Sequence, residues 1–72
     1  MNYRILSTYY ILSLEDKVEP MRCFVTDHPI LVPTPTENGG KFECVLCSYA
    51  FTPGLETLNN MKREIERATR QN

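Results

Sequence analysis

Four side chains with metal-binding chemistry stand in two pairs along this chain of 72 residues. Cys23 and His28 form the first pair, Cys44 and Cys47 form the second, and together they are all the cysteine and histidine of the sequence. Two thiolates separated by two residues can bind one metal ion from a single tight turn, and a second pair then completes a tetrahedron. The sequence therefore predicts one structural zinc site with these four ligands.

The fourth ligand of this site has two candidates. Cys23 and His28 are separated by four residues, which is a longer spacing than that of the second pair. Asp27 precedes the histidine and offers a carboxylate oxygen, which zinc also accepts. We expect His28 to bind and Asp27 to compete with it. A different interpretation is that no metal binds and that the chain folds only on a partner.

The size and charge of the chain limit its functions. Seventy-two residues form a single domain (1–72) with a small core, so a bound metal would contribute folding free energy directly. The net charge of −1 provides no overall positive field for nucleic acid or an anionic membrane. Three cysteines would leave one thiol unpaired in a disulfide framework, which favours a reducing, cytoplasmic setting.

The elements that must position the ligands follow from apolar runs and turn residues. Residues 3–14 are rich in β-branched and aromatic side chains and predict a strand, as do residues 18–26, 30–32 and 41–46. Residues 37–40, Glu-Asn-Gly-Gly, predict a hairpin turn because Asn-Gly and Gly-Gly tolerate positive φ. The first run is interrupted by polar residues and is too short to span a bilayer, so we expect neither a cleaved leader nor a membrane protein.

The pattern changes to that of a helix after residue 52. Thr52 can cap a helix, Pro53 suits the first helical position, and apolar residues then recur at three- and four-residue steps. This stripe consists of Leu55, Leu58, Met61, Ile65 and Ala68. We therefore expect an α+β fold, with small antiparallel hairpins in a zinc-ribbon-like arrangement over residues 1–52 and one C-terminal amphipathic helix over residues 53–71.

The segment 42–53 resembles the first knuckle of rubredoxins and related zinc ribbons over about a sixth of the chain. The shared features are an aromatic residue two positions before Cys44, the C-x2-C spacing, aromatic residues at the second and fourth positions after Cys47, and a following proline. The resemblance implies a rubredoxin-like turn at the two cysteines. It also implies that the turn is closed over by Phe42, Tyr49 and Phe51.

Two features depart from that family. Ser48 stands where the family usually has glycine, which predicts strain where backbone amides approach sulfur. The second knuckle of the family is absent, and Cys23 with His28 takes its place. An imidazole in place of a thiolate favours zinc over a redox-active iron centre.

Catalysis has little support in the sequence. Four protein ligands close the coordination shell, whereas a catalytic zinc keeps one position open. Cys23 could act as a nucleophile with His28 as its base, but so short a chain offers little room for a substrate cleft. We expect no enzyme and no small-molecule substrate.

The leading functional hypothesis is a zinc-binding accessory or structural subunit that docks onto a larger protein assembly or forms a homo-oligomer. A strand over residues 3–14 would be apolar on both faces, and one helix can cover only one of them. The residues expected to contact a partner are Tyr3, Tyr9, Tyr10, Ile11 and Leu12 of this strand and Leu58, Met61 and Ile65 of the helix.

An alternative hypothesis is a zinc ribbon that binds nucleic acid or a polymerase. Its residues would be Lys41, Arg63, Arg67 and Arg70. Ion pairs between Lys62 and Glu66 and between Glu66 and Arg70 would neutralise much of this basic face. The alternative therefore ranks second.

Overall fold

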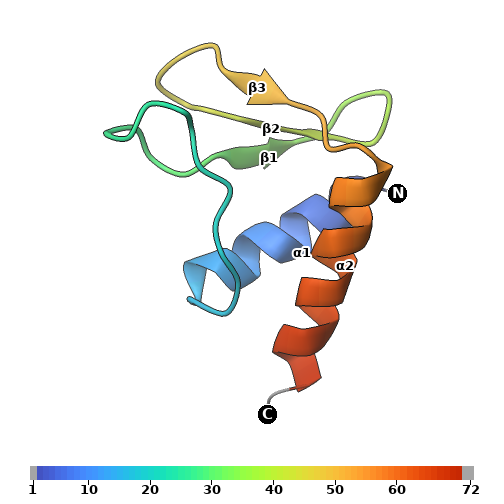
Figure 1. Ribbon diagram of the computed structural model, residues 1–72. Helices are drawn as coiled ribbons and strands as arrows, with labels where there is room; N and C mark the ends of the chain where they lie inside the picture. The colour runs from blue at the N-terminus through green and yellow to red at the C-terminus, as the bar shows by residue number, and fades with distance from the viewer. Residues whose placement is uncertain (1, 71–72) are drawn as a thin grey trace.

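The computed structural model of the protein describes residues 2–70 and contains two helices and a small sheet (Figure 1). The elements in chain order are α1 (Asn2–Leu14), β1 (Val32–Thr34), β2 (Lys41–Glu43), β3 (Ala50–Phe51) and α2 (Leu55–Arg70). The three strands form one antiparallel sheet in the order β1-β2-β3. The predicted α+β class is confirmed, but there are two helices where one C-terminal helix was expected.

The segment predicted as the first strand is the helix α1. Its buried residues Leu6, Tyr9 and Leu12 recur every three positions, which is a helical spacing. Apolar residues occupy all sides of this segment, so its sequence is compatible with a period of two as well as with a helical period. The helix uses these several faces because it packs against β1, β2 and α2.

The end of α1 has a defined local structure. The amide of Lys17 donates to the carbonyl of Leu12 at 2.9 Å, and the amide of Asp16 donates to the carbonyl of Ser13 at 3.2 Å. Asp16, which donates the second of these bonds, has a φ of 64°. This pattern is a Schellman motif with aspartate in the left-handed position where glycine is most frequent. Residues 15–17 thus form the C-terminal cap of α1.

The predicted strands of the central segment are only partly right. Residues 18–26 form no strand, and their one sheet-like pairing is an isolated bridge between Arg22 and Ile30. The strand predicted at residues 30–32 lies two residues later as β1 and includes Pro33, which pairs with Phe42. Proline is tolerated there because β1 is an edge strand.

The second half of the sheet is shorter than predicted. The strand expected over residues 41–46 ends at Glu43. The two-residue strand β3 was not predicted, and Phe51 in it pairs with Phe42. Strands this short form through their neighbour in the sheet, so the local sequence gives little signal for them.

The predicted hairpin turn at residues 37–40 is confirmed between β1 and β2. Gly39 and Gly40 have φ of 115° and 149°, values that residues with a Cβ rarely adopt. Both are buried, and a Cβ on Gly39 would lie 2.8 Å from Cβ of Asn2. A Cβ on Gly40 would lie 3.3 Å from Cα of Tyr3. The two glycines therefore let the first turn of α1 approach the hairpin closely.

The helix α2 begins two residues later than predicted. The amide of Leu58 donates to the carbonyl of Gly54 at 2.9 Å, so Gly54 is the N-cap, and neither Thr52 nor Pro53 has its predicted role. Leu58, Met61 and Ala68 are buried as the stripe predicts, and Ile65 is half-buried. Leu55 is 75% exposed and does not belong to the buried stripe. Residue 71, the predicted end of the helix, lies outside the described residues.

The core joins all parts of the molecule. Its most deeply buried large side chains are Leu6 of α1, Leu31 before β1, Phe42 of β2 and Met61 of α2. Cys23 and Cys44 are buried in the same cluster. Neither helix within residues 2–70 has the length and apolar character that crossing a membrane requires.

Candidate metal centre

Two loops at the same end of the sheet carry the four predicted ligands (Figure 1). The first loop, residues 22–30, is closed at its base by the bridge between Arg22 and Ile30. The second loop, residues 44–49, connects β2 to β3, and the amide of Cys44 donates to the carbonyl of Tyr49 at 2.9 Å. Each ligand pair therefore lies in a short loop with a fixed base.

The structure brings the four predicted ligands into one cluster. Cys23, His28, Cys44 and Cys47 each offer one ligand atom, and these atoms all lie within 4.8 Å of one another. The Sγ atoms of Cys23 and Cys47 are 3.7 Å apart, and Nδ1 of His28 lies 3.6 Å from Sγ of Cys23 and 3.3 Å from Sγ of Cys44. We call these four residues the ligand cluster.

These distances agree with the edges of a zinc tetrahedron. Zinc binds sulfur at about 2.3 Å and nitrogen at about 2.0–2.1 Å, so a tetrahedron requires about 3.8 Å between two sulfurs and about 3.6 Å between sulfur and nitrogen. The three distances given above lie near these values. A disulfide would bring the two sulfurs to about 2.05 Å, and all three cysteines are free thiols. The ligand cluster can therefore hold a single metal ion.

The structure distinguishes between the two candidates for the fourth ligand. His28 is half-buried, and its amide donates to the carbonyl of Val25 at 3.1 Å, a turn that brings the imidazole to the thiols. Asp27 is exposed and does not belong to the ligand cluster. The histidine, through Nδ1, completes the set.

The pKa values of the two thiols of the second pair, Cys44 and Cys47, are shifted in opposite directions. Burial alone would raise the pKa of the Cys44 thiol. Hydrogen bonds from the backbone amides of Leu46 and Cys47, together with the side chains of Cys47 and His28, outweigh burial and lower that pKa to about 6. A backbone hydrogen bond from Tyr49 acts to lower the pKa of Cys47, yet burial and two neighbouring thiols raise it overall. Thiols this close resist joint ionisation, so a cation among them would stabilise the thiolate forms.

The second loop has the amide-to-sulfur contacts that the rubredoxin resemblance implies. The amide of Leu46 donates to Sγ of Cys44 at 3.4 Å. Among residues 2–70, Asp16 is the only residue other than glycine with a positive φ. Ser48 therefore does not adopt that conformation. The strain predicted at the position of the family's glycine is therefore not present in the backbone.

Aromatic rings connect this loop to the core, as the resemblance also implies. Phe42 stacks on Phe51 with ring centroids 5.7 Å apart, and Tyr49 lies 6.4 Å from Phe51. The sequence analysis missed Phe24, whose ring meets Tyr49 edge-on at 5.1 Å. Its position directly after the ligand Cys23 was the available signal. The row of rings thus runs from the core to both loops.

The residues expected to contact a partner have different environments. Tyr9, Leu12, Leu58 and Met61 are buried in the core, where the two helices and the sheet use them internally. Tyr3, Tyr10 and Ile65 are half-buried, and Ile11 is 52% exposed. The argument for two apolar strand faces no longer applies, because the segment is a helix.

Each of the four basic residues of the alternative hypothesis has a polar partner. The pairs are Lys41 with Glu43 at 3.8 Å, Arg67 with Glu64 at 3.4 Å, Arg70 with Glu66 at 2.8 Å, and Arg63 with Asn60 through a hydrogen bond. Lys41 lies in β2, whereas the three arginines lie in α2. These pairings do not favour a nucleic-acid surface.

Comparison of the chain with protein-family models, curated protein sequences and solved structures gave no match.

Proposed function

We propose that the protein is a non-catalytic module that binds one structural zinc ion through the ligand cluster and docks onto a partner protein. The observation that carries the metal assignment is the convergence of four ligand atoms from two separate loops to within 4.8 Å of one another. Fifteen residues separate His28 of the first pair from Cys44 of the second pair. The convergence of the two pairs is therefore a property of the fold.

The donor set supports zinc as the metal. Three thiolates and one imidazole form a combination that binds zinc tightly, whereas magnesium and calcium prefer oxygen ligands. The edge lengths described above fit the tetrahedral geometry of structural zinc sites.

The closed donor set supports a structural role. Four protein ligands fill a tetrahedral shell and leave no position for a substrate or for water. The two loops contain no regular secondary structure between their bases, so a metal ion would fix their relative position. Structural zinc sites in small domains contribute apparent binding free energies of about 10–16 kcal/mol, comparable with the whole stability of a typical domain.

The docking role is supported by exposed apolar residues. Phe24, Val45 and Leu46 are 73%, 63% and 65% exposed, and each lies next to a ligand of the cluster in the chain. Large apolar side chains gathered on the surface of a small domain are typical of sites that contact another protein.

The metal assignment is tested by measuring the zinc content of the purified protein and of two variants by elemental mass spectrometry. The native protein and Asp27→Asn should each carry one zinc ion per chain, because Asp27 lies outside the ligand cluster. Cys44→Ser should lose most of the metal. Ser48→Ala, in the same loop and exposed, is the matched control and should retain it.

Cobalt substitution tests the geometry independently. The cobalt-loaded native protein should show the absorption of a tetrahedral site with thiolate charge-transfer bands, and His28→Ala should change this spectrum. A native protein that binds no zinc, or a Cys44→Ser variant with unchanged zinc content, would refute the assignment.

A further inference from the structure

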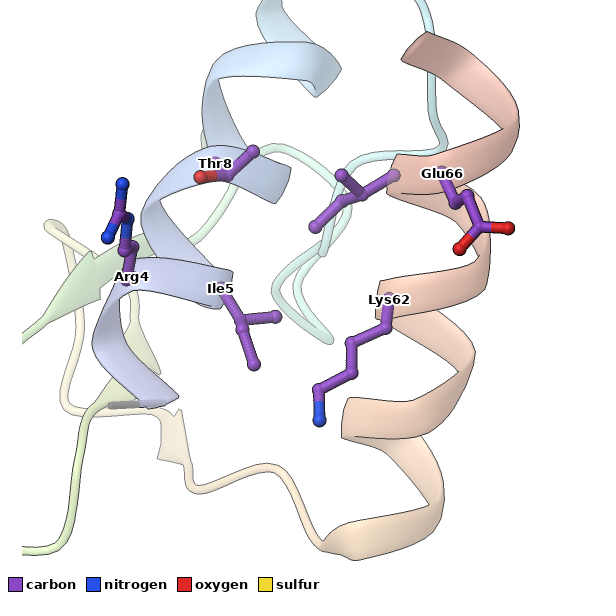
Figure 2. A pocket seen from close by; sticks show the side chains of 6 residues that line it. Arg4, Ile5, Thr8, Lys62 and Glu66 are labelled. Carbon is purple, nitrogen blue, oxygen red and sulfur yellow. The ribbon is translucent and has the colours of Figure 1, made fainter. Parts of the chain in front are cut away.

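An open groove lies between the two helices, away from the ligand cluster (Figure 2). Its volume is about 470 Å³, and it is lined by Arg4, Ile5 and Thr8 of α1 and by Lys62, Ile65 and Glu66 of α2. No residue of the two metal-binding loops takes part in it. The groove is large enough to take one or two side chains of a ligand.

The floor of the groove is apolar. Ile5 and Ile65 are half-buried, and both pack against the core while leaving part of their surface in the groove. An apolar side chain placed on these two isoleucines would remove further apolar surface from water, which is favourable. The groove therefore offers a seat for one apolar side chain.

The rim of the groove carries cations that lack a counter-ion. Neither Arg4 nor Lys62 has an ion pair within residues 2–70. The predicted pair between Lys62 and Glu66 does not form. Lys62 extends toward α1, whereas the carboxylate of Glu66 points away from α1 (Figure 2). The predicted pair of Glu66 and Arg70 is confirmed at 2.8 Å, so Arg70 is the cation beside that carboxylate.

The position of Arg4 strengthens this positive field. It lies in the first turn of α1, which contains no acidic residue. The N-terminal end of a helix carries a partial positive charge, and acidic side chains usually offset it. The formal charges of the lining residues Arg4, Lys62 and Glu66 sum to +1, in a protein whose net charge is −1.

We propose that this groove binds an acidic amphipathic segment of a partner protein. One apolar side chain of the segment would lie on Ile5 and Ile65, while a flanking carboxylate accepts a hydrogen bond from Lys62. A second carboxylate would reach across α1 to Arg4, whose guanidinium lies on the side of α1 away from α2 (Figure 2). A peptide is favoured over a small molecule because Arg4, Thr8, Lys62 and Glu66 are all exposed, so the groove is open along the helices and does not enclose a ligand. The proposal extends the docking role and rests on it, but it does not depend on the metal.

The test is a nuclear magnetic resonance titration of the full-length, isotope-labelled protein with a synthetic peptide. The probe is a helical peptide of about twelve residues with leucines on one face, each flanked by glutamates, since such anchors suit a groove between helices. A second peptide of the same sequence has lysine in place of every glutamate. The acidic peptide should bind and should shift the resonances of residues 4–8 and 62–66, and the basic peptide should not bind.

A pair of charge reversals on α2 tests the contact itself. Lys62→Glu should weaken binding by at least about tenfold, whereas Arg63→Glu, the same change at the adjacent residue outside the groove, should weaken it by less than about threefold. Both side chains are exposed, so both variants should fold. Arg4→Ala provides a second rim variant with the same expected direction.

Three outcomes would overturn the proposal. The first is equal loss of binding in Lys62→Glu and Arg63→Glu, which would indicate attraction by net charge alone. The second is resonance shifts confined to residues 22–30 and 44–49, which would place the contact on the metal-binding loops. The third is binding to phosphatidylserine vesicles, reversed by Lys62→Glu, without peptide binding. Zinc content measured on the same samples keeps a failure here distinct from a failure of the metal assignment.

Discussion

The two loops that carry the ligand cluster, residues 22–30 and 44–49, differ from the helical part of the molecule in how much apolar surface they bury. In the helical part, Leu6 and Met61 are almost fully buried, and apolar contact between α1 and α2 stabilises the structure. In the loops, Phe24, Val45 and Leu46 stay largely exposed although they are apolar. The loops therefore leave more apolar surface exposed than the helices do, although Cys23 and Cys44 are buried in the shared core.

This difference shows how a short chain can build a domain. A chain segment of this size buries a small fraction of its surface, and α1 has contacts with α2, β1 and β2. Phe42 is the link between the two parts, because it is 1% exposed in the core and is two positions from the ligand Cys44. A metal ion at the ligand cluster would join the two loops to each other.

Removal of the metal by a chelator should have the largest effect, and this effect should be unequal. The amides of residues 22–30 and 44–49 should lose protection from hydrogen exchange, because a metal ion at the ligand cluster would join these loops. The amides of α1 and α2 should keep more of their protection, since the contact between the helices remains. Hydrogen exchange followed by mass spectrometry, with and without chelator, measures both regions in one sample. Simultaneous loss in both regions would mean that they form one cooperative unit.

Phe42→Ala should have the next largest effect, because it removes the link between the two regions. Truncation of a buried phenylalanine typically lowers the free energy of unfolding by about 3–5 kcal/mol. Urea denaturation of the zinc-loaded protein measures this change, and zinc affinity should fall with it. Leu55→Ala is the control, since Leu55 is 75% exposed and its truncation should change stability by less than about 0.5 kcal/mol. A loss below about 1 kcal/mol for Phe42→Ala would contradict the linking role.

Two features of the molecule, the ligand cluster and the helix α2, could be predicted from the sequence. The ligand cluster was predictable because thiolates and an imidazole at chelating spacing have few other uses in a short chain. The helix α2 was predictable because its apolar residues lie on one side and its charged residues on the other. The spacing within each ligand pair and the periodicity of α2 are local signals, whereas the meeting of the two pairs depends on the fold.

The helix α1 could not be predicted in this way because its sequence lacks a polar face. Ile5, Leu6, Tyr9, Tyr10 and Ile11 lie on several sides of the helix, and the isoleucines and tyrosines among them favour a strand when they are considered alone. Contacts with β1, β2 and α2 make the helix the better solution, and these contacts are long-range. The groove beside Arg4 was hidden for the same reason, because it exists only between two helices.

Asp16→Gly should have the smallest effect and should act on the helical part alone. Asp16 has φ of 64° in the motif that ends α1, and glycine adopts this conformation without the steric penalty of a Cβ. The substitution should therefore raise the free energy of unfolding by up to about 1 kcal/mol, as measured by urea denaturation in the presence of zinc. Asp16→Val is the contrasting variant and should destabilise the protein, because a β-branched residue is strained at positive φ. Zinc affinity should be unchanged in Asp16→Gly, since the cap lies outside the ligand cluster. A shift in zinc affinity as large as the shift in stability would show that the end of α1 and the metal-binding loops are coupled, and the division between the two regions would then be wrong.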